Sequence, residues 1–316
     1  MGFNRFSLPA VAVIMMINAM LLSQGCLEEE RIALLQIKTS FNLTSYPWGE
    51  DALCCSWYGV TCSNSTTRRV VEIHLSNSIS WSLEDWYPIS MAGWYSDASM
   101  GGWYLNASIF LPFQELNVLD LGGNGIAGCV ANEGFERLSR LAKLEVLYLG
   151  INNFNNSILS SLKELSSLKD LFLNDNQLQG SINMKVSEGL SKLNKLESLD
   201  LSYNNFNNSI LSSLKGLSSL KYLSLDGNRL QGSINMKEFD SLSNLEVLSL
   251  YYNKIQEFIT LTGSEGPSRL NKLESLILEA NHFNNSVLSS LKGLSSLKHL
   301  DLERNQLQGS IDMKGT

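Results

Sequence analysis

Leucines recur along residues 116–316 at positions that fit a short strand in every unit. The pattern L-x-x-L-x-L-x-x-N-x-L/I/F returns every 24 to 28 residues. Its second and third leucines alternate with other residues, as expected for the inward side of a strand. One such strand cannot bury its leucines alone, whereas stacked strands share a continuous core. The pattern predicts eight stacked units, which begin at Leu116, Leu144, Leu168, Leu196, Leu220, Leu245, Leu273 and Leu297.

An asparagine follows each predicted strand at a fixed position. Its amide can donate to and accept from backbone groups that a sharp turn leaves unpaired, including those of the adjacent unit. Between the strands lie runs such as residues 211–220, where a leucine at every third position favours a short helix or 3-10 turn. We interpret the asparagines as structural residues rather than a binding site: Asn124, Asn152, Asn176, Asn204, Asn228, Asn253, Asn281 and Asn305.

These patterns predict an α/β fold, a leucine-rich-repeat solenoid. A curved parallel β-sheet would line its concave face, and short helical or 3-10 segments would line its convex face. Residues 152–185, 204–237 and 281–314 are near copies of one another, so the true unit is partly a pair of repeats.

The first 25 residues differ from everything that follows. Arg5 precedes an apolar run over residues 8–22, and the small residues Ser23 and Gly25 stand just before Cys26. This layout predicts a secretory signal peptide, because the run is shorter than the ~20 apolar residues that a membrane anchor needs. Ser23 also disfavours a bacterial lipoprotein site at Cys26. No later segment is apolar enough to cross a membrane, and we expect the chain to enter the secretory pathway.

Six Asn-x-Ser/Thr sequons predict glycans on exposed loops of a secreted chain. Three of them occupy the same place in the three near copies, so their glycans would project from one side of the solenoid. That flank would be shielded, which leaves partners the concave face or the other flank. The sequons are at Asn42, Asn64, Asn106, Asn155, Asn207 and Asn284.

The segment between Cys26 and Cys62 is expected to cover the first layer of the core. It carries a helix-like run over residues 28–41, then Trp48 and Trp57. Four cysteines in an exported chain indicate two disulfides, for which three pairings are possible. Those cysteines are Cys26, Cys54, Cys55 and Cys62. The fifth cysteine, Cys129, is expected to be a buried thiol rather than a partner in a further disulfide.

Particular segments resemble plant extracellular leucine-rich-repeat proteins. The cap residues read C-L-E-E-E-R-I-A-L-L-Q-I-K and then C-C-S-W-Y-G-V-T-C; residues 103–116 and 128–136 are similar to plant receptor-like proteins in particular. The resemblance implies pairing of Cys26 with Cys54 and of Cys55 with Cys62. It also implies a receptor with a signal peptide, a repeat ectodomain, one membrane span, a short tail without a kinase, and a co-receptor kinase as a possible partner.

The chain departs from that family in two respects. Residues 230–234 keep the Gly and Ile of the plant consensus L-x-G-x-I-P, but Asn235 replaces the Pro. The chain also stops at Thr316 within a repeat, and this stretch holds no membrane span. We interpret it as the N-terminal portion of a receptor, with a short secreted protein as the alternative.

The predicted division is a signal peptide at 1–25, a plant-type cap at 26–69, irregular first repeats with an aromatic-rich insertion at 70–115, and the repeat array at 116–316, its last repeat incomplete. The insertion favours an elaborated junction between cap and repeats over a sugar-binding platform. Its aromatic residues are Trp81, Trp86, Tyr87, Trp94, Tyr95, Trp103 and Tyr104.

Charge and composition exclude several functions. The net charge is −7, from 24 basic and 31 acidic residues, without a Lys/Arg cluster that would bind nucleic acid. The histidines His74, His282 and His299 are scattered and predict no metal site, and no cofactor is expected. Ser-x-x-Lys recurs only because the repeat recurs, so we expect no enzyme.

Outward positions of the predicted strands are the candidate ligand contacts, because aromatic residues among acidic ones form a plausible recognition surface. We predict a non-catalytic recognition module for a protein or peptide, with a pathogen or the cell wall as candidate sources, in a receptor of immune or developmental signalling. The alternatives are a soluble inhibitor of polygalacturonases and a structural cell-wall or adaptor module. The candidates are Tyr148, Phe172, Asp200, Tyr203, Asp226, Tyr251, Tyr252, Glu279, Asp301 and Glu303.

Overall fold

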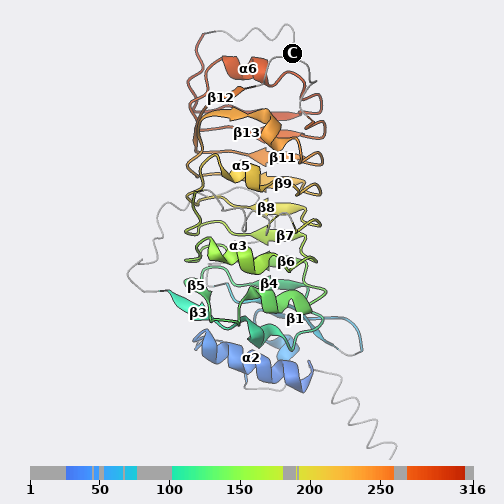
Figure 1. The fold of residues 1–316 in the computed structure, drawn as a ribbon. Helices are drawn as coiled ribbons and strands as arrows, with labels where there is room; N and C mark the ends of the chain where they lie inside the picture. The colour runs from blue at the N-terminus through green and yellow to red at the C-terminus, as the bar shows by residue number, and fades with distance from the viewer. Residues whose placement is uncertain are drawn as a thin grey trace, which may run out of the picture.

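The repeats stack along one axis, with the N-terminal helix at one end and the last repeats at the other (Figure 1). The structure, a computed structural model, describes residues 26–44, 46–49, 53–66, 68–76, 102–180, 190, 192–259 and 269–309. The predicted signal peptide and part of the aromatic insertion lie outside these residues, namely 1–25 and Trp81, Trp86, Tyr87, Trp94 and Tyr95.

The main sheet runs the length of the stack, one strand per repeat. Its ten strands follow chain order, with β1 and β2 antiparallel and all later neighbours parallel. Each repeat strand covers the x-L-x segment of the leucine pattern, so the predicted strands are confirmed. The strands are β1 (Val60–Cys62), β2 (Val70–His74), β4 (Val118–Asp120), β6 (Val146–Tyr148), β7 (Asp170–Phe172), β8 (Ser198–Asp200), β9 (Tyr222–Ser224), β11 (Val247–Ser249), β13 (Ser275–Ile277) and β14 (His299–Asp301).

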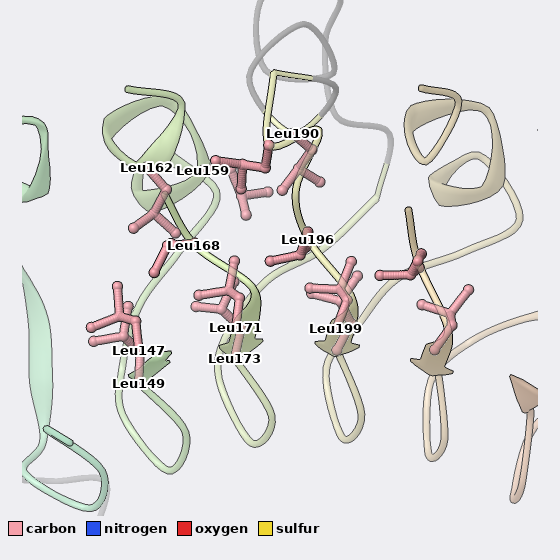
Figure 2. Close-up of a cluster of buried hydrophobic side chains, with 14 of the residues drawn as sticks. Leu147, Leu149, Leu159, Leu162, Leu168, Leu171, Leu173, Leu190, Leu196 and Leu199 are labelled. Carbon is pink, nitrogen blue, oxygen red and sulfur yellow. The ribbon is translucent and has the colours of Figure 1, made fainter. Parts of the chain in front are cut away.

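Leucines from successive repeats fill the space between the sheet and the opposite wall. Figure 2 shows Leu147, Leu171 and Leu199 of three adjacent strands in line, with Leu159 and Leu162 of a helix facing them. All five side chains are fully buried. Burial of one such side chain contributes about 1.5–3 kcal/mol, so the stability of the array comes from this shared core.

Short helices form the wall opposite the sheet, as the leucine spacing predicts. Some repeats have a 3-10 segment there instead, since each repeat has room for only a short helical segment. The helices are α3 (Ser157–Leu162), α5 (Ile210–Ser213) and α6 (Ser286–Ser290), and the 3-10 segments are η2 (Ala107–Phe110), η3 (Phe135–Arg140) and η4 (Met236–Phe239).

Two small parallel sheets lie outside the main one, where the chain travels from the strand to the opposite wall. One pairs β3 (Trp103–Leu105) with β5 (Ile126–Cys129), and the other pairs β10 (Gln231–Asn235) with β12 (Lys254–Ile259). The leucine pattern does not reveal these strands, which lie beyond the asparagine of each repeat.

The N-terminal cap packs a helix against the first layer of the core. Helix α2 (Glu28–Ser40) agrees with the predicted run, and η1 (Cys54–Ser56) follows it. The structure joins Cys26 to Cys54 and Cys55 to Cys62, which is the pairing that the resemblance implies. The indoles of Trp48 and Trp57 stack with centroids 5.7 Å apart, and both are buried.

Glu30 connects the cap helix to the first strand. Its side chain is fully buried, and its carboxylate accepts hydrogen bonds from Arg69 Nε at 2.8 Å and from the Val70 amide at 3.2 Å. A buried carboxylate needs such partners because it has lost its water. The contact fixes the N-terminal end of helix α2 against β2.

Trp103 belongs to the junction between cap and repeats. Its ring lies edge-on to Phe41 with centroids 5.0 Å apart, and its indole N–H donates to the carbonyl of Asn124 at 2.8 Å. Tyr104 is 63% exposed. These contacts agree with the structural interpretation for Trp103. Among the described residues, every helix is too short or too polar to cross a membrane.

Candidate ligand-binding face

The candidate site is the solvent face of the main sheet, which the sequence analysis predicts as the concave face. Strand pairing aligns one residue from each repeat into a single column. The register therefore places four of the candidates in one line. The column reads Asp120, Tyr148, Phe172, Asp200, Ser224, Ser249, Ile277 and Asp301.

Tyr148 and Phe172 form an aromatic platform in this column. Their rings are nearly parallel, with an interplanar angle of 9° and centroids 4.4 Å apart, and both side chains are half-buried. Burial raises the pKa of the Tyr148 phenol, so the ring presents an uncharged hydroxyl. Two stacked rings on neighbouring strands form one aromatic unit with polar neighbours, in which the faces turned toward each other are covered.

Carboxylates lie beside the platform. Asp170 stands two residues before Phe172 on β7, and Asp200 is the register partner of Phe172 on β8. Both are half-buried, and burial raises the pKa of each. Poorly hydrated carboxylates gain from a cationic partner, so this part of the face suits a lysine or arginine side chain.

Asp226 differs from the other acidic candidates because it is buried, with 7% of its surface exposed. Its Oδ1 accepts hydrogen bonds from the Ser249 hydroxyl at 2.5 Å and the Tyr251 amide at 2.8 Å. Burial raises its pKa to about 6. These contacts give the carboxylate a role within the sheet, and of the ten candidates it is among the least accessible.

Three tyrosines border the face at the turn that follows each strand. Tyr203 and Tyr252 have positive φ, 50° and 52°, as do the equivalent residues of other repeats. Tyr203 covers Gly227, where a Cβ atom would lie 2.6 Å from the tyrosine ring, so the glycine makes room for it. Burial raises the pKa of Tyr203 to about 12. Tyr251 and Tyr252 lie with ring centroids 5.9 Å apart.

The last repeats carry a mixed-charge cluster. Arg304 lies 3.5 Å from a carboxylate oxygen of Glu279 and 4.0 Å from one of Glu303. Asp301 is the register partner of Ile277 and is half-buried. The predicted acidic end of the face is therefore partly neutralised by an arginine that the sequence analysis did not select.

Tyr222 and Asp170 also belong to the face although the sequence analysis did not name them. They occupy the outward position before the second leucine of the unit, in register with Ser198 between them. Burial raises the pKa of Tyr222, with Asp200 and Asp226 as further causes. The same alternation that selected Phe172 could have found both residues.

The repeated asparagines form a continuous hydrogen-bonded ladder. Asn204 Nδ2 donates to the carbonyls of Leu173, Leu201 and Ser202 at 2.9, 3.2 and 3.0 Å, and its Oδ1 accepts from the Leu178 amide at 3.0 Å. Asn152 and Asn281 make the equivalent contacts in their repeats. The side chains are buried, which agrees with a structural role.

All six predicted glycan acceptors are exposed. In Asn155, Asn207 and Asn284 the Oδ1 atom accepts a hydrogen bond from the serine amide two residues later, at 2.9, 3.0 and 2.8 Å. Their Nδ2 atoms, which would carry the glycan, donate to no other described residue. The three side chains therefore share one conformation on the same flank.

The described residues include no cluster of His, Cys, Asp and Glu that could hold a metal ion. Cys129 is a free thiol that is partly rather than fully buried, and burial raises its pKa to about 12. A thiol with such a pKa is a weak nucleophile at neutral pH.

Comparisons with known proteins agree with this architecture. Residues 27–63 match the family model of the leucine rich repeat N-terminal domain, and residues 195–217 match that of the leucine rich repeat. The chain is 32% identical over 306 residues to Cuscuta receptor 1 of Solanum lycopersicum, an alignment that covers 83% of this chain and 25% of that protein. It is 36% identical over 187 residues to Receptor-like protein 9a of Arabidopsis thaliana, covering 58% and 18%.

The chain thus spans a quarter or less of the length of these two relatives. Among solved structures, the crystal structure of a plant ice-binding protein superposes with a TM-score of 0.58, covering 92% of this chain and 83% of that one at 22% identity. That likeness shows a shared fold.

Proposed function

We propose that this chain, a leucine-rich-repeat protein whose curated relatives are plant receptor-like proteins, is the ligand-sensing portion of an extracellular receptor ectodomain. The observation that supports the proposal is the Tyr148–Phe172 platform, which lies in register with Asp200 on the solvent face of the main sheet. Aromatic residues at the centre of a surface are the usual anchors of protein recognition. The role is non-catalytic.

The ligand is a protein or peptide with a basic side chain beside an apolar one. The apolar group would pack on the platform, and the basic group would lie between the ring faces and the carboxylates of Asp170 and Asp200. Tyr203, Tyr251 and Tyr252 would extend the contact toward the last repeats. Immune or developmental signalling is the proposed context, with a co-receptor kinase as a second partner.

The proposed route to this location is the secretory pathway. Residues 1–25 would be removed as a signal peptide, 26–69 form the cap, 70–115 the irregular first repeats, and 116–316 the array. The two disulfides of the cap are at home in an oxidising compartment. No feature of the described residues favours the polygalacturonase-inhibitor or structural alternatives.

The test is a binding screen with the secreted, glycosylated chain immobilised on a biosensor. A library of basic and acidic peptides is passed over the wild type and over Tyr148→Ala/Phe172→Ala. We expect basic peptides to bind and the double variant to weaken them about tenfold or more, since anchor residues contribute about 2 kcal/mol or more. A matched control is Tyr58→Ala/Tyr104→Ala, because these two rings are exposed elsewhere on the chain. Binding that is unchanged in the platform variant, or lost equally in the control, would refute the proposal.

A further inference from the structure

A stripe of basic side chains follows the asparagine ladder on the flank of the solenoid. Arg229, Lys254 and His282 each come directly after a ladder asparagine, in three consecutive repeats. The Lys254 amide donates to the carbonyl of Leu230 at 2.8 Å, and the His282 amide donates to that of Ile255, also at 2.8 Å. Each bond joins the residue after a ladder asparagine to the second residue after the preceding one, so the three side chains, all exposed, lie in a row. We call this row the basic flank.

The two cations of the basic flank have no compensating carboxylate. Within the described residues, neither Arg229 nor Lys254 takes part in an ion pair. The lysines that directly follow the first leucine of a unit behave differently, since each of the three pairs with a glutamate of the preceding repeat: Lys169–Glu145 at 2.8 Å, Lys221–Glu197 at 2.6 Å and Lys298–Glu274 at 2.7 Å. Other described cations, such as Lys195 and Lys292, also take part in no ion pair, so what distinguishes Arg229 and Lys254 is that they occupy the same position in consecutive repeats.

An open pocket adjoins the stripe. Its lining includes Tyr252, Lys254, His282 and Arg304, together with Gln306, which is exposed. Tyr252 is 63% exposed and can lie against an aliphatic or backbone segment. The nearby carboxylates are Glu279, which Arg304 neutralises at 3.5 Å, and Glu257, which accepts from the Ser233 hydroxyl at 2.5 Å.

The sequons leave this part of the flank open. The third position after the ladder asparagine is a sequon asparagine in the repeats of Asn204 and Asn281, as Asn207 and Asn284. In the two repeats between them the same position is a glutamine, Gln231 or Gln256. Elsewhere in the array the sequon-bearing repeats of Asn152 and Asn204 are separated by a single repeat that has glutamine at this third position. Arg229 and Lys254 therefore lie within the widest interval between acceptors that share this position, and His282 lies in the repeat that ends it.

We infer that the basic flank around Arg229, Lys254 and Tyr252 is a second docking surface, which takes an acidic peptide segment of a partner protein. Charge complementarity identifies the partner, because Arg229 and Lys254 take part in no ion pair among the described residues and the exposed amide of Gln306 can bind a peptide backbone. From the repeat of Arg229 to that of Arg304 is three strand spacings, about 14 Å. An extended segment of about four residues spans that distance. This surface borders the extended ligand contact at Tyr252 but includes neither Tyr148 nor Phe172.

The experiment uses the secreted, glycosylated chain and an acetylated, amidated octaglutamate peptide at low salt. We expect it to bind the wild type and to weaken about tenfold or more in Arg229→Glu/Lys254→Glu, with the loss reduced at high salt because exposed charges are screened. The matched control is Lys195→Glu/Lys292→Glu, which reverses two exposed lysines outside the stripe and gives the same net charge. The control should bind octaglutamate as the wild type does.

Three results would overturn the inference: no binding of octaglutamate, equal weakening in the control, or tighter binding of an oligogalacturonate of equal charge, which would make the partner a polysaccharide. Thermal melts check that both variants fold, and the exposed positions of the four residues make this the expected result. The variant Tyr148→Ala/Phe172→Ala should leave octaglutamate binding unchanged. Failure of the platform proposal is thereby separable from failure of this one.

Discussion

Replacement of Asn204 by alanine tests the ladder that connects neighbouring repeats. The three carbonyls that Asn204 serves each keep another donor: Leu173 keeps Asn176 Nδ2, Leu201 keeps Asn228 Nδ2, and Ser202 keeps the Asp175 amide. The Leu178 amide is different, because the Asn204 side chain is the acceptor that the structure gives it and Leu178 is fully buried. The substitution thus leaves one buried N–H without an acceptor.

The magnitude follows from that count. A buried donor without an acceptor costs about 1–3 kcal/mol, and the loss of three shared donor bonds and of the packed side chain adds about 1 kcal/mol. We expect Asn204→Ala to lower the free energy of unfolding by about 3 kcal/mol. Asn204→Asp retains an acceptor for Leu178 but points a second carboxylate oxygen at the carbonyls, so it should destabilise more than alanine at pH 7 and recover toward pH 3 as it is protonated.

Guanidinium denaturation followed by far-ultraviolet circular dichroism measures the stability. Hydrogen exchange measures the local effect. The backbone amides of the segment that contains Leu178 should lose protection before those of other segments. The matched control is Asn205→Ala, because among the described residues the Asn205 side chain makes no hydrogen bond. An aspartate variant as stable as wild type at pH 7, or a control as damaging as Asn204→Ala, would refute the ladder argument.

Three further outcomes are expected. Folding raises the pKa of Asp226 from about 4 to about 6, so between these pH values the native chain holds a proton that the unfolded chain releases. The free energy of unfolding should therefore fall by up to about 3 kcal/mol as pH rises from 4 to 7. Denaturation measured at each pH should show a flatter slope for Asp226→Asn. The Cys26–Cys54 bridge closes 28 residues and Cys55–Cys62 closes 7, so paired serine substitutions should cost about 3.6 and about 2.4 kcal/mol in that order, a ranking that equal melts would contradict. Mass spectrometry of the secreted chain should find glycan on the three exposed, equivalent acceptors Asn155, Asn207 and Asn284. Unoccupied sites would remove the glycan boundary of the basic flank.

The fold could be predicted closely because its determinants are periodic. Leu171 and Leu199 are predictable as buried strand residues from alternation alone, and Asn204 as a turn residue from its fixed offset. The cap helix follows from its apolar run. The small sheet of β10 and β12 escaped prediction because the residues of β10 recur only in the near copies and those of β12 do not match them, and because the pairing depends on where the backbone leaves each turn.

The candidate site could be predicted only in outline. Register placed Tyr148 beside Phe172, but alternation could not say that their rings stack. Asp226 and Asp200 occupy outward positions of the same kind of unit, yet Asp226 is covered because Ser249 and the Tyr251 amide close over it. Such coverage depends on side chains of the next repeat, which a one-repeat pattern does not contain.

The order of the repeats explains why the two proposed surfaces differ. In the array the alternation of sequon and glutamine repeats lapses once, where the repeats of Asn228 and Asn253 follow one another. The lapse brings Arg229 next to Lys254, since each occupies the position after its ladder asparagine, and it separates Asn207 from Asn284. The platform needs no such lapse, because every repeat already offers an outward strand position. The variant Gln231→Asn together with Ser233→Thr creates a sequon in the repeat of Asn228, within the basic flank. Its glycan should block octaglutamate and leave peptides that bind Tyr148 and Phe172 unaffected.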